Sequence, residues 1–313
     1  MTTPTQAGQQ QPPPVRRRNG TAPFYSPLRY PGGKRKLANF ISLLYRSNRL
    51  LDGDYAEVYA GGGAVALTLL YGQYASRVHI NDLDPGVYAF WVTARDNTDA
   101  LCRLVSGAKL TMGEWERQRK VLLSKQPEQL DLAFATFYLN RTNRSGIITG
   151  GVIGGRDQTG AWKIDARFNR VDLVRRIERV GRWASRIGVT NLDGADFLRT
   201  VAPTLPEKSL VYLDPPYFVK GQEKLYANYY EPSDHAEIAT LVQALERPWM
   251  VSYDDGAEVR DLYHQRRAVD YDIAYSASER YRGREVAFFS DGLTIPAAAD
   301  PAKVTTSDLV RTA

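Results

Sequence analysis

The run Asp214-Pro215-Pro216-Tyr217 holds the residue types best suited to chemistry. It directly follows four apolar residues, 210–213, which predict a strand that ends at Asp214. The prolines fix a rigid turn and have no N–H group, so their carbonyl oxygens remain available as acceptors. The Asp214 carboxylate and one such carbonyl could accept both hydrogens of one amino group, and the Tyr217 ring offers a flat face for a nucleobase. The run therefore predicts a site for an exocyclic amine. The simpler alternative is an Asp-Pro turn after a strand.

A second group of residues surrounds the glycine turn 61–63, between a predicted strand at 55–60 and a predicted helix at 64–71. Glycines let a ligand approach the backbone closely, and a helix N-terminus offers unpaired N–H groups. Asp82 follows Gly63 by 19 residues and ends the next predicted strand, where an acidic side chain can accept ribose hydroxyls. This arrangement predicts a nucleoside-binding end of a parallel sheet, with a plain tight turn as the alternative. The spacing departs from G-x-G-x-x-G and disfavours a nicotinamide cofactor.

A third motif is Tyr30-Pro31-Gly32-Gly33-Lys34. A phosphate loop would need a further glycine upstream and a Ser or Thr after the lysine. Arg35 follows Lys34 instead, so the motif does not predict an ATP site. A turn that starts a helix is the simplest interpretation.

The charge is unevenly distributed along the chain, which has 41 Lys and Arg against 35 Asp and Glu. Residues 1–51 contain 9 basic residues and no acidic residue, and residues 141–186 contain 11 basic and 4 acidic residues. Two basic segments on an otherwise acidic protein favour a polyanionic partner. Solvated surface charge is the alternative.

Strands that alternate with helices predict a layered α/β fold. A helical, basic segment at 101–189 separates the part of the chain with the glycine turn from the part with Asp214. Within this segment we expect a loop at 141–163 and a helix that begins at Asp172. We expect the apolar stripe of that helix to be Leu173, Ile177, Val180, Ala184 and Ile187. Further strands are expected at 78–81, 210–213, 249–253, 268–275 and 285–290, the last two as an antiparallel pair.

The composition excludes several classes of protein. Hydrophobic residues make up 43% and charged residues 24%, so the chain is neither wholly disordered nor collagen-like nor membrane-spanning. The single cysteine, Cys102, cannot form an internal disulfide. The three histidines share no ligand spacing, so no metal site is expected. No membrane anchor or secretory signal is predicted, and residues 1–23, rich in Gln, Pro and Thr, are expected to be a disordered tail.

Taken in chain order, these motifs resemble those of the Dam-like DNA adenine methyltransferases, the alpha-group enzymes that methylate adenine N6. The resemblance covers residues 27–292. Tyr30 replaces a tryptophan frequent in relatives, and the block after Asn140 differs from the GATC-methylating relatives, so the target sequence is not implied. The matching elements are Tyr30 to Lys34, Glu57 to Gly63, Asn81-Asp82, Phe137 to Arg141, Asp196-Phe197, Asp214 to Tyr217, and Glu285 to Ser290.

The resemblance implies a doubly wound, seven-stranded Rossmann-like sheet with one antiparallel strand. It implies S-adenosylmethionine as cofactor and a helical, basic insert that recognises the target. The implied domains are a catalytic domain at 24–100 plus 190–295 and a DNA target-recognition insert at 101–189. A flexible C-terminal tail is expected at 296–313.

The resemblance also assigns site residues. Asp214, Pro215, Pro216 and Tyr217 would be catalytic. The residues expected at the cofactor are Tyr30, Lys34, Glu57, Tyr59, Gly61, Gly63, Asp82, Asp196 and Phe197, with Asp82 at the ribose and the last two at the adenine. Arg141, Asn143, Arg144 and Ser145 are expected at DNA base edges, with the helix arginines that follow them at phosphates.

The expected partner is double-stranded DNA, in the cytoplasm and its nucleoid. We expect neither a metal nor a membrane to take part. Whether a cognate restriction endonuclease is a partner is left open. The nearest rival activity is methylation of cytosine N4. Three further functions remain open: methylation of RNA, DNA binding by a regulator without catalysis, and nicotinamide-dependent oxidoreduction.

Overall fold

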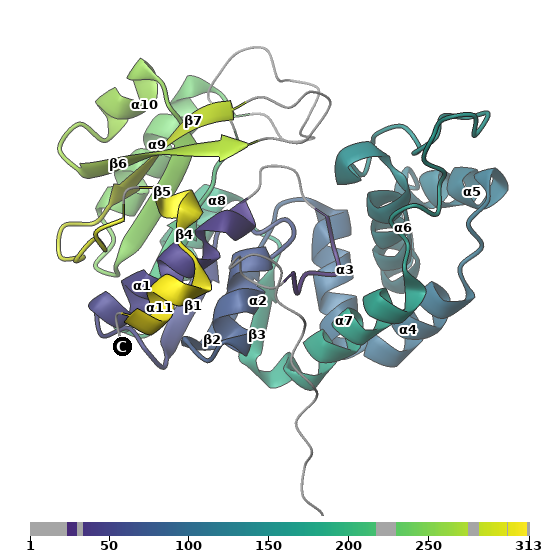
Figure 1. The fold of residues 1–313 in the computed structure, drawn as a ribbon, viewed down its shortest axis with the longest axis horizontal. Helices are drawn as coiled ribbons and strands as arrows, with labels where there is room; N and C mark the ends of the chain where they lie inside the picture. The colour runs from purple at the N-terminus through teal and green to yellow at the C-terminus, as the bar shows by residue number, and fades with distance from the viewer. Residues whose placement is uncertain (1–23, 30–33, 217–229, 275–281, 299, 312–313) are drawn as a thin grey trace, which may run out of the picture.

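The computed structural model describes residues 24–29, 34–216, 230–274, 282–298 and 300–311. Within them, a seven-stranded sheet runs in the order β3-β2-β1-β4-β5-β7-β6 (Figure 1). β7 is antiparallel to both of its neighbours, whereas the other paired strands are parallel. The predicted doubly wound α/β sheet with one antiparallel strand is therefore confirmed. The strands are β1 (Gly53–Glu57), β2 (Ala75–Asn81), β3 (Ile187–Thr190), β4 (Leu210–Leu213), β5 (Trp249–Asp254), β6 (Arg267–Ala274) and β7 (Arg282–Phe289).

Helices cover both faces of the sheet, which explains the uninterrupted apolar sequence of β4. Leu210 and Tyr212 pack in one core, and Val211 and Leu213 pack in the other. Side chains alternate between the two faces of a strand, so a strand that is buried on both has no polar position. The first core is covered by α1 (Ala38–Ser47), α2 (Ala64–Tyr71) and α3 (Pro85–Asp96), and the second by α8 (Gly194–Thr200), α9 (Pro232–Gln243) and α10 (Ala257–Leu262).

Local sequence sets where α2 and α3 begin. Asp84 Oδ1 accepts hydrogen bonds from the N–H groups of Gly86 at 2.8 Å and Val87 at 3.0 Å, and Pro85 opens α3. Gly63 precedes α2 with a φ of 53°, a left-handed conformation that glycine adopts without strain. α2 starts where the sequence predicts it, and both helices follow the carboxyl ends of β1 and β2.

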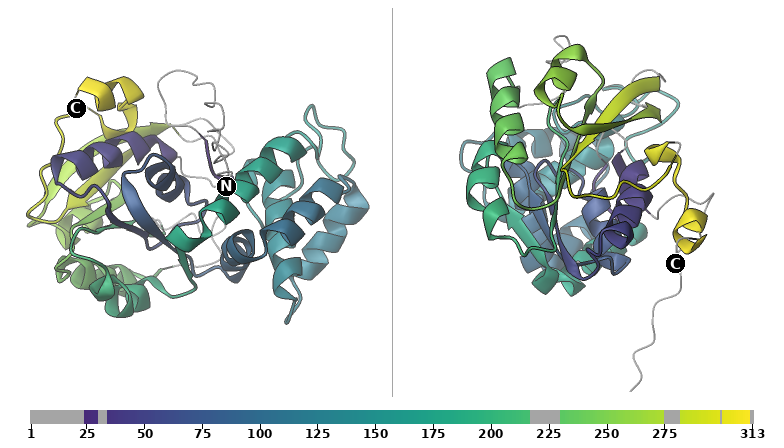
Figure 2. Two further views of the ribbon diagram at one scale, coloured as in Figure 1. Left: turned by 90° about the horizontal axis from the view of Figure 1, so that it is seen from below. Right: turned by 90° about the vertical axis from the view of Figure 1, so that its left-hand side faces the viewer.

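Four of the described helices form a lobe on the right of Figure 1, and the left view of Figure 2 shows that this lobe stands beside the sheet. The ring of Phe137 in the lobe stacks on Phe90 of α3 with 5.7 Å between centroids. α3 therefore joins the lobe to the sheet. The lobe contains α4 (Thr98–Gly107), α5 (Met112–Leu122), α6 (Gln129–Thr142) and α7 (Arg170–Arg182).

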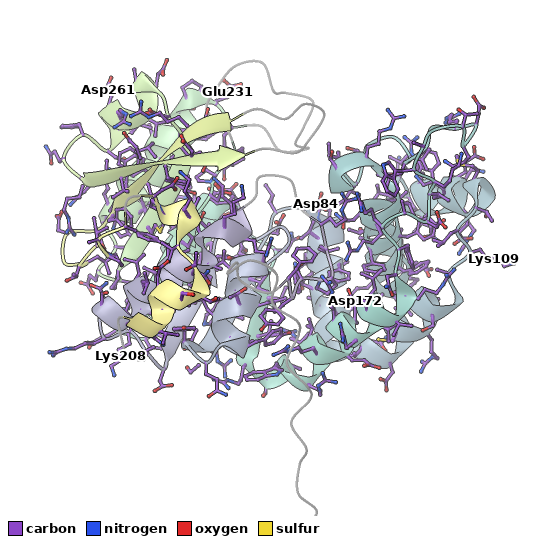
Figure 3. The ribbon with its side chains drawn as sticks, viewed as in Figure 1. Asp84, Lys109, Asp172, Lys208, Glu231 and Asp261 are labelled. Carbon is purple, nitrogen blue, oxygen red and sulfur yellow. The ribbon has the colours of Figure 1, made fainter. Side chains whose placement is uncertain are left out.

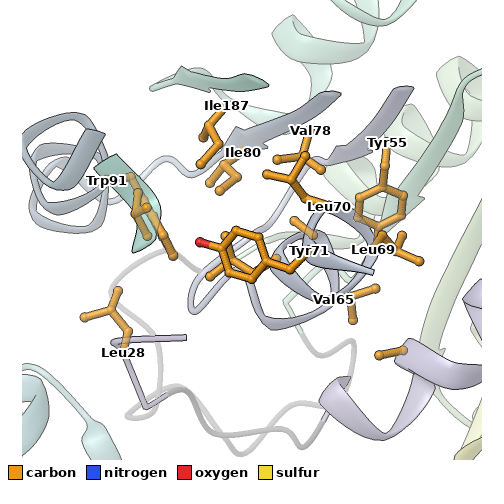
Figure 4. Packing of buried hydrophobic residues seen from close by; sticks show 14 of the residues in the cluster. Leu28, Tyr55, Val65, Leu69, Leu70, Tyr71, Val78, Ile80, Trp91 and Ile187 are labelled. Atoms are coloured by element: carbon orange, nitrogen blue, oxygen red, sulfur yellow. The ribbon is translucent and has the colours of Figure 1, made fainter. Parts of the chain in front are cut away.

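The end of the lobe differs from the prediction. The helix that was expected to carry Ala184 and Ile187 on its apolar stripe ends at Arg182. Ile187 instead begins β3 and pairs with Val78 of β2, so the insert ends before residue 187 rather than at 189. Ile187 is buried in the same core as the stripe residue Ile177 (Figure 4 shows it near Val78), so its apolar character fits either element.

The C-terminal segment also differs from the expected flexible tail. A short 3-10 turn, Pro301–Lys303, and α11 (Thr306–Arg311) lie beside α1 (Figure 1). Val304 and Leu309 are buried, and Asn39 Nδ2 of α1 donates a hydrogen bond to the Val304 carbonyl at 2.9 Å. Two well-spaced apolar side chains are enough to attach this segment to the first core.

The expected disordered tail at 1–23 lies outside the described residues. Of the helices that the structure describes, none combines the length and the apolar character needed to cross a membrane.

Candidate active site

The glycine turn and Asp214 meet at the point where the strand order reverses. β1 lies next to β4, and the strands continue as β2-β3 on one side and β5-β7-β6 on the other. Glu57 ends β1, and Asp214 directly follows β4. In open α/β sheets, ligands bind outside the carboxyl ends of the strands at this reversal. The topology therefore brings the two predicted motifs to one site.

Asp214 is held by a lysine and a serine. Lys34 Nζ lies 2.9 Å from Asp214 Oδ1, and Ser252 Oγ donates a hydrogen bond to the same oxygen at 3.0 Å. The Asp214 side chain remains 27% exposed. Among the described residues, both contacts to this carboxylate fall on Oδ1, so Oδ2 is the oxygen available to a substrate.

Glu285 holds the other side of the lysine. Its Oε2 lies 2.5 Å from Lys34 Nζ and accepts a hydrogen bond from Tyr271 OH at 2.7 Å. The Glu285 side chain has no exposed surface. Tyr271 and Glu285 are register partners on β6 and β7, so the antiparallel pair places both beside Asp214.

The charges of this cluster act on Asp214 in opposite directions, with a net rise in its pKa. Burial alone would lower the pKa of Lys34, but the carboxylates of Asp214 and Glu285 outweigh it and raise that pKa. Burial raises the pKa of Asp214, Lys34 opposes this effect, and Glu285 adds to it. Lys34 is therefore a cation at neutral pH and favours the ionised form of Asp214.

Glu57 leaves a buried acceptor beside the glycine turn. Its Oε1 accepts hydrogen bonds from Tyr55 OH at 3.1 Å and from the Ala66 N–H at 3.2 Å. Its Oε2 is buried, and none of the described residues donates to it. Burial raises the pKa of Glu57 to about 8. A buried carboxyl oxygen without a donor is costly, so this atom fits a ligand that brings one.

Asp82 fixes the turn to the end of β2. Its Oδ2 accepts from the Gly61 N–H at 2.7 Å, and its Oδ1 accepts from the Asp84 N–H at 3.0 Å. Burial raises the pKa of Asp82 to about 7. Trp91 Nε1 donates to the Gly61 carbonyl at 2.9 Å. A Cβ on Gly63 would lie 2.9 Å from the Trp91 ring, so the tight packing requires glycine there.

The structure does not bring Asp196 and Phe197 to the site as expected. The Asp196 side chain is 61% exposed and pairs with Arg199 at 3.4 Å, and Phe197 is wholly buried in the second core. A second acidic residue, Asp193, lies three positions earlier and caps α8 by accepting from the Ala195 N–H at 2.8 Å. Helix periodicity explains the difference, because a residue in the first turn of α8 can point outwards while its N-cap faces the strand ends.

Tyr59 lies against the Asp193 end of α8. Its hydroxyl donates to Tyr230 OH at 3.1 Å, and Tyr230 OH donates to Asp193 Oδ2 at 3.0 Å. A Cβ on Gly194 would lie 2.1 Å from Tyr59 OH, so the chain approaches Tyr59 very closely. The prediction for Tyr59 is thus compatible with the structure. Asp193 had no sequence signal beyond its acidic character.

Two predicted residues, Tyr30 and Tyr217, lie outside the described residues. Pro215 is buried and Pro216 is half-buried next to Asp214. In the part of the chain that the structure describes, no group of three or more His, Cys, Asp or Glu side chains could hold a metal ion.

The predicted base-reading residues divide into buried and accessible ones. Asn143 is fully buried: its Oδ1 accepts from Trp115 Nε1 at 2.7 Å, and its Nδ2 donates to the carbonyls of Ile147 at 3.0 Å and Ile148 at 2.8 Å. Its amide therefore holds the loop in this structure, and the prediction that it reads a base edge stays a prediction. Arg141 is also buried, whereas Arg144 is exposed and Ser145 is half-buried.

Two arginines of α7, expected at phosphates, instead fasten the segment 24–29. The guanidinium of Arg176 lies 4.6 Å from the Phe24 ring centroid and donates to the Ser26 carbonyl at 2.9 Å. Arg179 lies 4.0 Å from the Tyr71 centroid and 4.6 Å from that of Tyr25. Arg175 and Arg182 remain exposed. Stacking on rings is a structural use of arginine that charge counting does not distinguish from anion binding.

Comparison with known proteins agrees with this geometry. Residues 30–277 match the model of the D12 class N6 adenine-specific DNA methyltransferase family. No curated protein sequence matches the chain.

Among solved structures, a protein of Pyrococcus horikoshii assigned as an RNA methyltransferase is 12% identical, with a TM-score of 0.41 over 84% of this chain and 86% of the other. The rRNA methyltransferase AviRa of Streptomyces viridochromogenes is 15% identical, with a TM-score of 0.36 over 84% and 87% of the two chains. TrmK of M. capricolum, in complex with S-adenosyl-homocysteine, is 7% identical, with a TM-score of 0.32 over 80% and 71%. The family match spans most of the chain and contains the switch-point site, so this protein is a methyltransferase that belongs to the D12 class N6 adenine-specific DNA methyltransferase family.

Proposed function

We propose that this methyltransferase transfers a methyl group from S-adenosylmethionine to the exocyclic N6 amine of an adenine flipped out of double-stranded DNA. The observation that carries the proposal is the carboxylate of Asp214, held through one oxygen by Lys34 and Ser252 at the switch point. Its second oxygen and the adjacent Pro215 carbonyl form a pair of acceptors for an amino group. The family match supports adenine as the base and DNA as the substrate.

Two positioned hydrogen-bond acceptors would make the exocyclic amine a better nucleophile. The lone pair of an exocyclic amine is conjugated with the ring, so the nitrogen is a poor nucleophile. Asp214 and the Pro215 carbonyl would accept its two hydrogens and favour tetrahedral geometry at nitrogen. The nitrogen lone pair would form the new N–C bond while the C–S bond breaks and its electron pair stays on sulfur. One of the two N–H protons would then be lost, to Asp214 or to solvent. Most of the rate gain would come from positioning and preorganised acceptors.

The residues around the glycine turn fit S-adenosylmethionine. When bound, the cofactor supplies an electrophilic sulfonium methyl group. The buried Oε2 of Glu57 would accept from the donor groups of its methionine part, and Asp82 would accept from its ribose hydroxyls. Asp193 replaces Asp196 as the acidic residue proposed for the adenine end. Gly61 and Gly63 adopt positive φ angles of 46° and 53° and have no side chains of their own, which would let the cofactor approach the backbone of this turn.

Adenine must leave the duplex before Asp214 can reach it. Extrusion costs a few kcal/mol. Stacking on an aromatic ring recovers about 1–3 kcal/mol per base. We assign this stacking to Tyr217, which follows the acceptor pair in the sequence.

Modification mapping tests the proposal directly. DNA from cells that express the protein would be sequenced by a single-molecule method that detects modified bases, beside an Asp214→Ala control. N6-methyladenine at one recurring sequence, absent from the control, is the expected result. N4-methylcytosine would instead establish the rival activity, and DNA identical to the control would refute DNA methylation.

A further inference from the structure

A buried tyrosine and a buried serine form a chain of hydrogen bonds that ends on Asp214. Tyr212 lies on β4, two residues before Asp214, so an extended backbone places both side chains on the same face of the sheet. The Tyr212 hydroxyl lies 2.8 Å from Ser252 Oγ, and Ser252 Oγ donates to Asp214 Oδ1 at 3.0 Å. Tyr212 is 3% exposed, and Ser252 is fully buried. The chain therefore reaches the Asp214 carboxylate from within the core.

The central strands of the sheet bring these residues together. On β5, Met250 is the register partner of Tyr212. Two residues further along each strand, Ser252 comes level with Asp214. On β1, Glu57 is the register partner of Tyr212, so the tyrosine lies between the strand that ends at the glycine turn and the strand with the serine. Strand pairing rather than a loop therefore determines where Tyr212 and Ser252 lie relative to Asp214.

The direction of the hydrogen bonds follows from the hydrogens available. A serine hydroxyl has one hydrogen, and that of Ser252 goes to Asp214. Tyr212 must therefore donate to Ser252 Oγ. Burial, followed by the charge of Asp214, raises the pKa of the Tyr212 hydroxyl well above its ordinary value, and Glu285 and Glu57 add to this rise. The phenol hydrogen is consequently present at every pH at which the protein would be assayed.

A hydroxyl that is held in place acts on Asp214 more strongly than one that rotates. A serine hydroxyl turns about its C–O bond to suit its partners, so an unheld hydrogen would point away from Asp214 in some orientations. Because Ser252 Oγ accepts from Tyr212, its own hydrogen stays on Asp214 Oδ1. A hydrogen bond to a carboxylate favours the ionised form, and the Ser252 bond lowers the pKa of Asp214, as Lys34 does.

We propose that Tyr212 is a positioning residue for methyl transfer, which acts on Asp214 through the hydroxyl of Ser252. Lys34 and Ser252 then remain together on Oδ1, and Oδ2 stays available as an acceptor. That a substrate amine binds Oδ2 rests on the function proposed above. Packing alone does not require the Tyr212 hydroxyl, because a phenylalanine ring would fill nearly the same space in the core.

The test compares Tyr212→Phe with Tyr45→Phe, each of which removes one buried phenol hydroxyl from the first core. Tyr45 OH donates to the backbone carbonyl of Asp54 at 2.6 Å, near the amino end of β1. Lys208, two residues before β4 and labelled in Figure 3, marks this end of the sheet, whereas Asp214 follows the opposite end of β4. Urea unfolding should show a similar loss of stability in both variants. A purely structural role predicts that they also behave alike in every other measurement.

The first readout is the titration of Asp214 itself, which needs no activity. Carbon-13 NMR on protein labelled at its aspartate carboxyl groups follows the titrations, and Asp214→Asn identifies the Asp214 signal by its loss. Tyr212→Phe and Ser252→Ala should each move the midpoint of this titration to higher pH by about 0.5–1 pH unit. Tyr45→Phe should leave the midpoint unchanged. No change in Tyr212→Phe, or an equal change in Tyr45→Phe, would overturn the proposal.

The second readout is a double-mutant cycle on turnover. Tyr212→Phe should lower the turnover number about tenfold, as expected for the weakening of one hydrogen bond to a charged group. Its calorimetric affinity for S-adenosylmethionine should equal that of the wild type. In a Ser252→Ala background, Tyr212→Phe should have no further effect, because its connection to Asp214 is already lost. Additive losses would show that Tyr212 acts by another route and would overturn the proposal.

The two readouts separate this proposal from the proposed reaction. If the titrations shift as expected while the wild type methylates no DNA, the substrate assignment fails and the link from Tyr212 to Asp214 stands. If the wild type methylates adenine while Tyr212→Phe titrates normally, the reaction stands and the positioning role fails. If Tyr212→Phe folds poorly, Tyr212→Met takes its place with the same expected shift, because methionine adapts to irregular space in a core and has no hydroxyl.

Discussion

Lys34 and Asp214 form an ion pair in which Nζ lies 2.9 Å from Oδ1, the same oxygen that accepts from Ser252. Both donors therefore bind one side of the carboxylate. The other oxygen, Oδ2, takes part in neither of these contacts. This geometry favours Asp214 as a hydrogen-bond acceptor, because Lys34 opposes the rise in its pKa that burial and Glu285 cause.

Asp214→Asn tests that role with almost no change in size. The amide presents an N–H₂ group or a single neutral oxygen where the carboxylate presents two acceptors. We expect the turnover number to fall by about 10²–10³-fold, as when one preorganised group is removed from a polar active site. Affinity for S-adenosylmethionine should change by less than about threefold. Initial-rate assays and calorimetry measure both quantities, and near-normal turnover would contradict the mechanism.

Lys34 and Glu285 should shift the pH dependence of the reaction in opposite directions. Lys34 lowers the pKa of Asp214 and Glu285 raises it. Because the carboxylate is the active form, Lys34→Met should move the acidic limb of the turnover profile to higher pH. Glu285→Gln should move it to lower pH. Profiles measured between pH 5 and 9 on both variants provide the comparison, and shifts in the same direction would rule out this electrostatic account.

Glu57 and Asp82 predict that the cofactor-free protein loses stability as the pH rises. Burial raises the pKa of Glu57 to about 8 and that of Asp82 to about 7, above the values of an unfolded chain. The folded state then binds more protons than the unfolded state from about pH 4 up to about pH 8. The stabilisation is fully present below that window and is lost as the pH increases through it.

Urea unfolding at pH 5 and pH 8 measures this loss, which we expect to be on the order of a few kcal/mol. Glu57→Gln should be less sensitive to pH than the wild type, because its amide cannot ionise. An identical pH dependence in the variant and the wild type would show that Glu57 does not titrate in this range.

Asn143→Ala and Arg144→Ala separate the architecture of the loop from recognition of DNA. Removing the Asn143 amide deletes two donated hydrogen bonds and leaves Trp115 Nε1 without its acceptor. We expect a destabilisation of about 2–4 kcal/mol.

Arg144 is exposed, so its removal should leave the melting temperature unchanged and alter DNA affinity or site preference. Thermal melting and methylation of a randomised duplex pool distinguish the two. If Arg144→Ala keeps the wild-type affinity for DNA and the wild-type site preference, Arg144 does not read a base.

Much of the fold could be predicted because local patterns and tertiary structure agree. Local sequence agrees with the observed structure at three places: the apolar run that forms β4, the glycine before α2 and the Asp84-Pro85 pair at the start of α3. Ile187 shows where this agreement ends. Its spacing continues the helical stripe of α7, and only pairing with β2 identifies it as the start of a strand.

The sequence predicts which motifs form the candidate site, but it predicts fewer of the contacts between residues there. Asp214 and Asp82 follow strands, and the sequence shows that directly. The acid near Tyr59 is Asp193 rather than Asp196, because the rotation of one helical turn decides which carboxylate faces inwards. Ser252 and Tyr271 carried no signal, since their relevance depends on the order of β5, β7 and β6 in the sheet.

The bridge from Lys34 to Glu285 spans 251 positions of the chain. A ribosome must therefore synthesise β7 before the lysine can be held on both sides. Partial translation products that stop before β7 would lack this support, even though they contain both the glycine turn and Asp214. The contact thus joins the first described helical turn to the last strand of the sheet.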